Sequence, residues 1–126
     1  MKKVLITGIT GQDGAWLAKK LLGEGYDVYG AIRRGSTPKV GRLEYLGIVD
    51  SVKLVPLEIT EFSNVFRIVS TLKPDQIYNL AAKSFVQDSF AHPLLTAQIN
   101  YLGVQNLLEA IHLTGLDCSF YQASTS

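Results

Sequence analysis

Three glycines at three-residue spacing dominate the start of this sequence. An apolar run, residues 4–6, ends in Thr7, and Gly8, Gly11 and Gly14 follow at once. A strand that passes into a helix through such glycines is typical of a fold that binds the diphosphate of a dinucleotide. The first glycine permits a tight turn, the second lets the backbone approach the phosphates, and the third lets the helix pack closely. The spacing is G-x-x-G-x-x-G, a variant of the G-x-G-x-x-G fingerprint.

Length and charge set the class of protein. The 126 residues suit one domain, and 47% hydrophobic with 18% charged residues is ordinary for a globular chain. The formal charge of +1 gives no reason to expect nucleic acid or an anionic membrane as partner. The single cysteine, Cys118, cannot form an internal disulfide. It lies in an apolar run, which indicates a buried, inert thiol. We expect a soluble cytoplasmic protein with no membrane span and no metal site.

Strand-like and helix-like segments alternate along the whole chain. This alternation predicts an α/β fold, a Rossmann-like doubly wound parallel sheet with strand order 3-2-1-4-5, forming one domain over residues 1–126. Right-handed crossovers give that order. The expected strands are 3–7, 27–32, 52–57, 76–81 and 119–122. The expected helices are 11–24, about 39–46, 61–72 and 93–114.

Apolar spacing also predicts which helix faces are buried. Gly25 should end the first helix as a left-handed cap residue. The apolar stripe expected on the first helix is Trp16, Leu17, Leu21 and Leu22. The residues expected on or near one face of the helix 61–72 are Val65, Phe66, Ile68, Val69 and Leu72.

Two arginines at the end of the second strand bear on the choice of cofactor. In this fold a carboxylate at that place selects NAD, whereas arginine favours the 2′-phosphate of NADP. Here Arg33 and Arg34 are followed by Gly35 and Ser36, with no carboxylate. A guanidinium offers a planar fork of donors that matches a phosphate. The sequence therefore predicts NADP, with solvated surface charges as the alternative interpretation of the pair.

Other residues fall where the same ligand would lie. Glu58 and Ile59 follow the third strand and would read the adenine edge, unless Glu58 is only a charge at a helix N-terminus. Ser84 would hydrogen-bond near the nicotinamide or the substrate, although a serine in a turn is the ordinary interpretation. Asn100 either ties the last long helix to a neighbouring loop or is exposed. The remaining candidate cofactor-binding residues are Thr10, Gln12, Asp13, Leu80, Ala81 and Ala82.

Several segments together resemble the extended short-chain dehydrogenase/reductases that act on nucleotide sugars, and more specifically the GDP-mannose 4,6-dehydratase family. The Gly-Gln-Asp-Gly loop and the ending Phe-Tyr-Gln-Ala-Ser-Thr-Ser are the most specific parts of the likeness. The resemblance covers essentially the whole chain. The matching segments are 6–14, 33–34, 78–86, 106–111 and 120–126.

The resemblance implies an enzyme that uses NADP and GDP-mannose and makes GDP-4-dehydro-6-deoxymannose, on the route to GDP-fucose. The family oxidises the sugar at C4 by hydride transfer, eliminates water across C5 and C6, and returns the hydride to C6. A tyrosine aided by a lysine acts as base, and a glutamate handles the elimination. Thr125 matches the family's catalytic threonine, which hydrogen-bonds near the C4 oxygen. A homo-oligomer is also implied.

One part of the family's pattern is not found. None of the six tyrosines has a lysine four positions later, and the family's glutamate would follow Ser126. We therefore expect an N-terminal cofactor-binding part with no turnover of its own. The alternatives are the same part of another nucleotide-sugar epimerase or reductase, and a non-catalytic dinucleotide-binding module.

Overall fold

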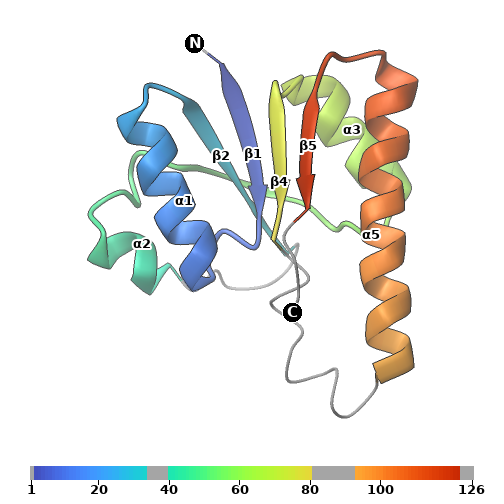
Figure 1. Ribbon diagram of the computed structural model, residues 1–126, viewed down its shortest axis with the longest axis horizontal. Helices are drawn as coiled ribbons and strands as arrows, with labels where there is room; N and C mark the ends of the chain where they lie inside the picture. Colours follow the sequence, from blue (N-terminus) through green and yellow to red (C-terminus); the bar gives the residue numbers. More distant parts are fainter. Residues whose placement is uncertain (1, 34–39, 81–92, 123–126) are drawn as a thin grey trace.

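Five parallel strands form the centre of the computed structural model, which describes residues 2–33, 40–80 and 93–122, the backbone alone for 93–100. The strand order is β3-β2-β1-β4-β5, as predicted. The strands are β1 (Lys3–Thr7), β2 (Asp27–Ile32), β3 (Lys53–Pro56), β4 (Gln76–Asn79) and β5 (Ser119–Gln122). The helices are α1 (Gln12–Gly23), α2 (Gly41–Tyr45), α3 (Phe62–Leu72) and α5 (Pro93–Thr114). Figure 1 shows α1 and α2 on one side of the sheet and α3 and α5 on the other.

Alternate residues of the strands build a core on each face of the sheet, because successive side chains point to opposite faces. In β1, Val4 and Ile6 belong to the core beneath α1 and α2, and Leu5 belongs to the core beneath α3 and α5. All three side chains are fully buried. A strand that is buried on both faces cannot slip by one residue without losing both cores, so the register of β1 is strongly specified.

The predicted element bounds are confirmed to within one or two residues at each described end. Gly25 has a φ of +90° directly after the C-cap of α1, as expected for a left-handed cap residue. Lys73 caps α3 with a φ of +52°, and the buried Pro74 follows it. The short helix expected at about 39–46 is α2.

The predicted buried faces need two corrections. Trp16 is 52% exposed, because α1 packs its small residues Ala15 and Ala18 onto the sheet and turns the indole outward under Lys19. Phe66 of α3 is 37% exposed, since the buried side chains of that helix are Asn64, Val65, Val69 and Leu72. Apolar spacing alone does not separate the packed stripe from its borders.

The thiol of Cys118 is free and partly buried. Burial, with Asp75 and Asp117 nearby, raises its pKa to about 11. The group is therefore protonated at neutral pH, as expected for an unreactive cysteine. None of the described helices is long and apolar enough to cross a membrane.

The glycine-rich loop after β1 is anchored to the sheet through Ile9. Its side chain is fully buried and lies against Gly30 of β2, where an added Cβ would be 2.6 Å from Ile9 Cγ1. A side chain at position 30 would therefore displace the loop. Gly30 was not singled out in the sequence, yet it fixes where the loop rests.

Gly30→Ala should lower the free energy of unfolding by about 1–3 kcal/mol, because the new methyl group overlaps Ile9. Urea unfolding followed by circular dichroism measures the loss. Gly23→Ala is the matched control, since no atom lies within 4 Å of the place that its Cβ would take and its φ is ordinary for a helix. That control should gain up to about 1 kcal/mol. Equal stabilities of the two variants would contradict the role of Gly30.

Candidate functional site

The candidate site lies at the carboxyl end of the sheet, where β1 passes into α1. Gly8 takes a φ of +72°, and its carbonyl oxygen accepts a hydrogen bond of 3.1 Å from the Gly11 N–H. Gly11 is the N-cap of α1, and no side chain caps the helix there. The first-turn N–H groups thus meet no capping side chain, and with the positive end of the helix dipole they can receive an anion.

Gly11 and Gly14 are needed for different reasons. A Cβ on Gly14 would lie 2.3 Å from the Gly8 carbonyl oxygen, so α1 can approach the loop only with glycine there. A Cβ on Gly11 would lie 3.4 Å from the same oxygen, which is ordinary contact. The protein itself therefore tolerates a side chain at Gly11, and the free space beside it is available to a ligand.

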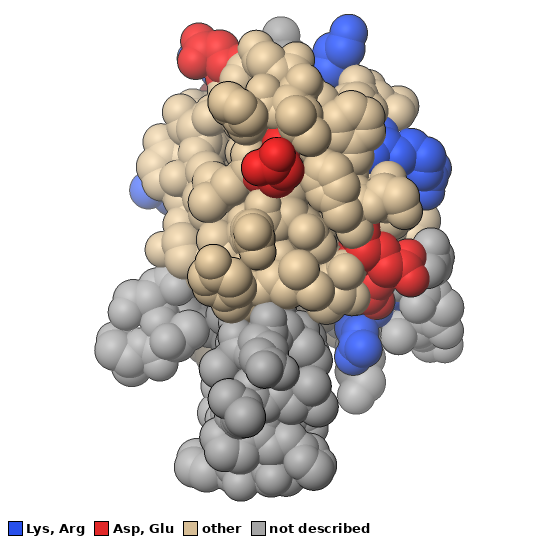
Figure 2. All heavy atoms as spheres, turned by 90° about the vertical axis from the view of Figure 1, so that its right-hand side faces the viewer, with Lys and Arg blue, Asp and Glu red and all other residues tan. Residues whose placement is uncertain are grey.

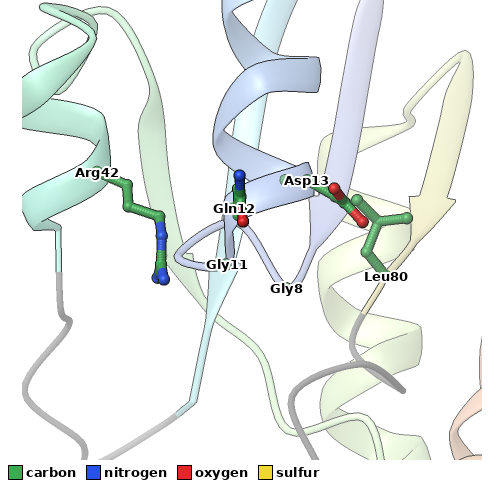
Figure 3. A pocket seen from close by; sticks show the side chains of 7 residues that line it. Gly8, Gly11, Gln12, Asp13, Arg42 and Leu80 are labelled. Atoms are coloured by element: carbon green, nitrogen blue, oxygen red, sulfur yellow. The ribbon is translucent and has the colours of Figure 1, made fainter.

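A cavity of about 330 Å³ opens over this loop (Figure 3). Figure 3 shows Arg42 on one side of the loop and Asp13 with Leu80 on the other. Gln12 lies between them, over the first turn of α1. The full lining is Gly8, Gly11, Gln12, Asp13, Gly14, Arg42 and Leu80.

Arg42 was missed by the sequence reasoning. The side chain comes from α2, and its Nη1 donates a hydrogen bond of 3.2 Å to the Thr10 carbonyl oxygen. This bond holds an exposed guanidinium beside the N-terminus of α1. The sequence signal for Arg42 is its position in the short helix predicted after the paired arginines. The motif at the end of β2 does not include it.

A polar network supports the floor of the site across three strands. The hydroxyl of Thr7 donates to Asn79 Oδ1 and accepts from the Leu80 N–H at 3.0 Å. Asn79 Nδ2 donates to Gln122 Oε1 at 2.8 Å. Thr7 and Asn79 are almost fully buried, so these bonds fix the ends of β1 and β4 beneath Leu80.

The turn after β3 lies at the same edge of the sheet as the cavity but does not line it. The N–H of Leu57 donates to the Ile32 carbonyl oxygen at 2.8 Å, which places the turn beside the end of β2 and the exposed Arg33. The Glu58 N–H donates to Asn64 Oδ1 at 2.7 Å. The amide of Glu58 is therefore occupied within the protein, and only its carboxylate remains to contact a ligand.

The structure thus brings most of the described candidate residues to one edge of the sheet. Five glycine-loop residues and Leu80 line the cavity, Thr10 receives Arg42, and Arg33, Glu58 and Ile59 follow the neighbouring strands. No group of three or more metal-ligating side chains occurs among the described residues. The candidates that lie outside the described residues are Arg34, Ser36, Ala81, Ala82, Ser84 and Thr125.

Comparison with known proteins identifies the family to which this chain is similar. The family model described as GDP-mannose 4,6 dehydratase matches residues 5–126. The chain is 46% identical to a GDP-mannose 4,6-dehydratase of Vibrio cholerae over 132 residues, covering 99% of this chain and 36% of that protein. It is 43% identical to the Homo sapiens GDP-mannose 4,6 dehydratase, covering 97% of this chain and 35% of that protein.

Solved structures show the same fold. The UDP-glucose 4-epimerase of Thermotoga maritima, determined with UDP-glucose, is 28% identical with a TM-score of 0.79, covering 98% of this chain and 38% of that one. The UDP-glucose 4-epimerase of Thermus thermophilus, in complex with NAD, is 27% identical with a TM-score of 0.73, covering 90% of this chain and 35% of that one.

The likeness to the dehydratases extends along almost all of this chain, whereas the chain spans about 36% of the length of the curated relatives. The glycine loop, the strand order and the sequence match all point to the same family. The chain therefore belongs to the GDP-mannose 4,6-dehydratase family.

Proposed function

We propose that this chain binds NADP and forms the cofactor-binding part of an enzyme that converts GDP-mannose to GDP-4-dehydro-6-deoxymannose. The observation that carries the proposal is the cavity over the uncapped first turn of α1, lined by the three glycines and Arg42. The names of the relatives support the substrate. The Thermus thermophilus structure in complex with NAD supports a dinucleotide.

The glycine loop would hold the diphosphate. The space at Gly11 allows the phosphates to approach the backbone, and the first-turn N–H groups of α1 face the same cavity. Arg42 adds a guanidinium that can neutralise a phosphate oxygen and donate to it. Thr10, Gln12 and Asp13 complete this contact region.

The end of β2 would hold the 2′-phosphate of NADP. Arg33 is exposed directly after β2 and has no carboxylate after it to favour an unphosphorylated ribose. We assign Arg34 and Ser36, which follow in the sequence, to the same phosphate. A guanidinium binds the 2′-phosphate of NADP more strongly than it binds the 2′-hydroxyl group of NAD, because its hydrogen bonds to the phosphate are charge-assisted.

The remaining candidates take the two ends of the dinucleotide. We assign Glu58 and Ile59 to the adenine edge. Leu80, with Ala81, Ala82 and Ser84 after it, is assigned to the nicotinamide side, and Thr125 is assigned to the oxygen on the sugar C4. When bound, the nicotinamide supplies hydride acceptance and return. The chain has no tyrosine–lysine pair at the family spacing, so we expect it to bind cofactor without turnover of its own.

The outward face of α5 supports the expected homo-oligomer. Figure 2 shows that this side of the molecule carries few charged side chains over its described part. Leu108 and Leu113 of α5 are each about half exposed. The single cysteine, which can form no internal disulfide, supports a reducing compartment, and we propose the cytoplasm.

Gly11→Ala should weaken NADP binding at least tenfold while changing the free energy of unfolding by less than about 1 kcal/mol. The reason is that the new methyl group fits the protein and occupies the ligand's space. Isothermal titration calorimetry with NADP, together with urea unfolding, measures the two quantities.

Gly14→Ala is the matched comparison, because its methyl group would overlap the Gly8 carbonyl oxygen. This variant should lose both binding and stability. Unchanged NADP affinity in Gly11→Ala, with wild-type protein binding well, would show that the diphosphate does not lie over the loop.

Arg33→Ala should weaken NADP about ten- to a hundredfold and leave NAD nearly unchanged, because only NADP carries the 2′-phosphate. Arg42→Ala should weaken NADP and NAD to similar extents, because both contain the diphosphate. Titration of each variant with each dinucleotide gives the four affinities.

Equal losses of NADP and NAD in Arg33→Ala would place that arginine away from the 2′-phosphate. A loss confined to NADP in Arg42→Ala would assign Arg42 to the 2′-phosphate instead of the diphosphate. Arg67→Ala, which removes an exposed arginine on α3, is the control and should change neither affinity.

A further inference from the structure

The turn between β3 and α3 is held from two directions. On its own side, Asn64 of α3 accepts from the Glu58 N–H at 2.7 Å, and the Glu61 N–H donates to the Glu58 carbonyl oxygen at 3.1 Å. The Thr60 hydroxyl donates to Glu58 Oε1 at 2.9 Å. These bonds set the direction of the Glu58 carboxylate.

The second set of contacts to this turn comes from α5, more than 40 residues later in the chain. Asn106 Nδ2 donates to the Ile59 carbonyl oxygen at 2.8 Å. Asn106 is 7% exposed and the bond is partly buried, so its loss would leave the Ile59 carbonyl oxygen without this partner.

The Ile59 side chain is fixed by the same helix. A Cβ on Gly103 would lie 2.6 Å from Ile59 Cδ1 and 3.1 Å from Cγ1. A methyl group at 103 would therefore press against the end of the Ile59 side chain and shift it. Gly103 and Asn106 are three residues apart, so both lie on the helix face that meets the turn.

We infer that Asn106 and Gly103 are positioning residues for adenine recognition: α5 holds Ile59 beside Glu58, where the groups of these two residues can read the edge of the base. The inference rests on the proposed binding of NADP. Adenine presents an amino donor beside the ring acceptor N1, so its reader needs an acceptor and a donor in fixed relation. The Glu58 carboxylate is the acceptor, and the Ile59 N–H, for which the described part of the chain gives no hydrogen-bond partner, is the donor.

This arrangement explains why a helix on the far side of the turn matters to the base. Asn106 binds the carbonyl group of Ile59, which belongs to the peptide plane after the Ile59 N–H. The two peptide planes meet at the Ile59 Cα. Fixing the Ile59 carbonyl and side chain therefore limits how far this Cα, and the N–H attached next to it, can shift. Without Asn106, Ile59 loses its hydrogen bond to α5 and can shift, while the Glu58 carboxylate keeps its bond to Thr60.

The test compares NADP with its hypoxanthine analogue, nicotinamide hypoxanthine dinucleotide phosphate. Hypoxanthine replaces the amino group with an oxo group and N1 with N–H, so it reverses the hydrogen-bond pattern. The measured quantity is the ratio of the two affinities by calorimetric titration. Wild-type protein should prefer NADP, and Asn106→Leu should lower that preference about five- to tenfold. The preference for NADP over NAD should stay at the wild-type value, because Arg33 is not moved.

Gln105→Leu is the matched control. This exposed amide is the neighbour of Asn106 on α5, so its loss should leave the base preference unchanged. A merely destabilising change would weaken both analogues alike and keep their ratio constant.

A second pair of variants decides the matter if Asn106→Leu does not fold. Gly103→Ala should lower the base preference by pushing against Ile59. The double variant Gly103→Ala/Ile59→Val removes the overlapping Cδ1 atom and should restore it.

The outcomes separate the two proposals. Wild-type protein that binds no NADP refutes the proposed function. Wild-type protein that binds NADP without preferring adenine, or variants that keep the full preference, overturn the positioning role and leave NADP binding intact.

Discussion

The contact between Gly14 and the Gly8 carbonyl oxygen is the constraint on which the site depends. With 2.3 Å between that oxygen and a would-be Cβ, α1 can start where it does only because position 14 has no side chain. The close approach directs the N-terminus of α1 to the carboxyl end of β1. Ile9 over Gly30 then fixes the loop from below. The lack of a side chain at Gly14 and Gly30 therefore leaves the N-terminus of α1 open beside the loop, where an anion is proposed to bind.

The three glycines therefore do not form one uniform motif. Gly8 serves the turn through its positive φ, Gly14 serves the packing of the helix, and Gly11 leaves open space. Only the last of these leaves room for a ligand. Gly103 is another glycine with a packing role, because the space left by its missing side chain is filled by the Ile59 side chain.

Most of the fold could be predicted from the sequence, because the apolar runs are short and punctuated by Gly25, Pro74 and Gly115. β1 and β2 were predicted with their observed bounds. The orientation of Trp16 could not be predicted, since α1 selects small residues for contact with the sheet. The periodicity of apolar residues alone favours a large apolar side chain over alanine as the residue that packs on the sheet.

The site could be predicted only where its residues are close in sequence. The glycine loop was visible as a motif, and so was Arg33 at a fixed distance from it. Arg42 reaches the loop through the placement of α2, and Asn106 reaches Ile59 through the packing of α5. Such contacts depend on tertiary structure. The sequence drew attention to Asn100, either as a tie to a neighbouring loop or as an exposed residue, and its side chain lies outside the described part. Asn106 of the same helix is the residue whose amide is seen to bind a loop carbonyl.

The exposed indole of Trp16 has a consequence of its own. It is the single tryptophan of the chain, and it lies one helical turn beyond Gln12 on the same face of α1. The Lys19 ammonium group sits 5.4 Å from its ring centre. All intrinsic indole fluorescence therefore originates beside the glycine loop, in contact with solvent and a positive charge. The molecule therefore contains its own fluorescent reporter one helical turn away from a residue that lines the cavity.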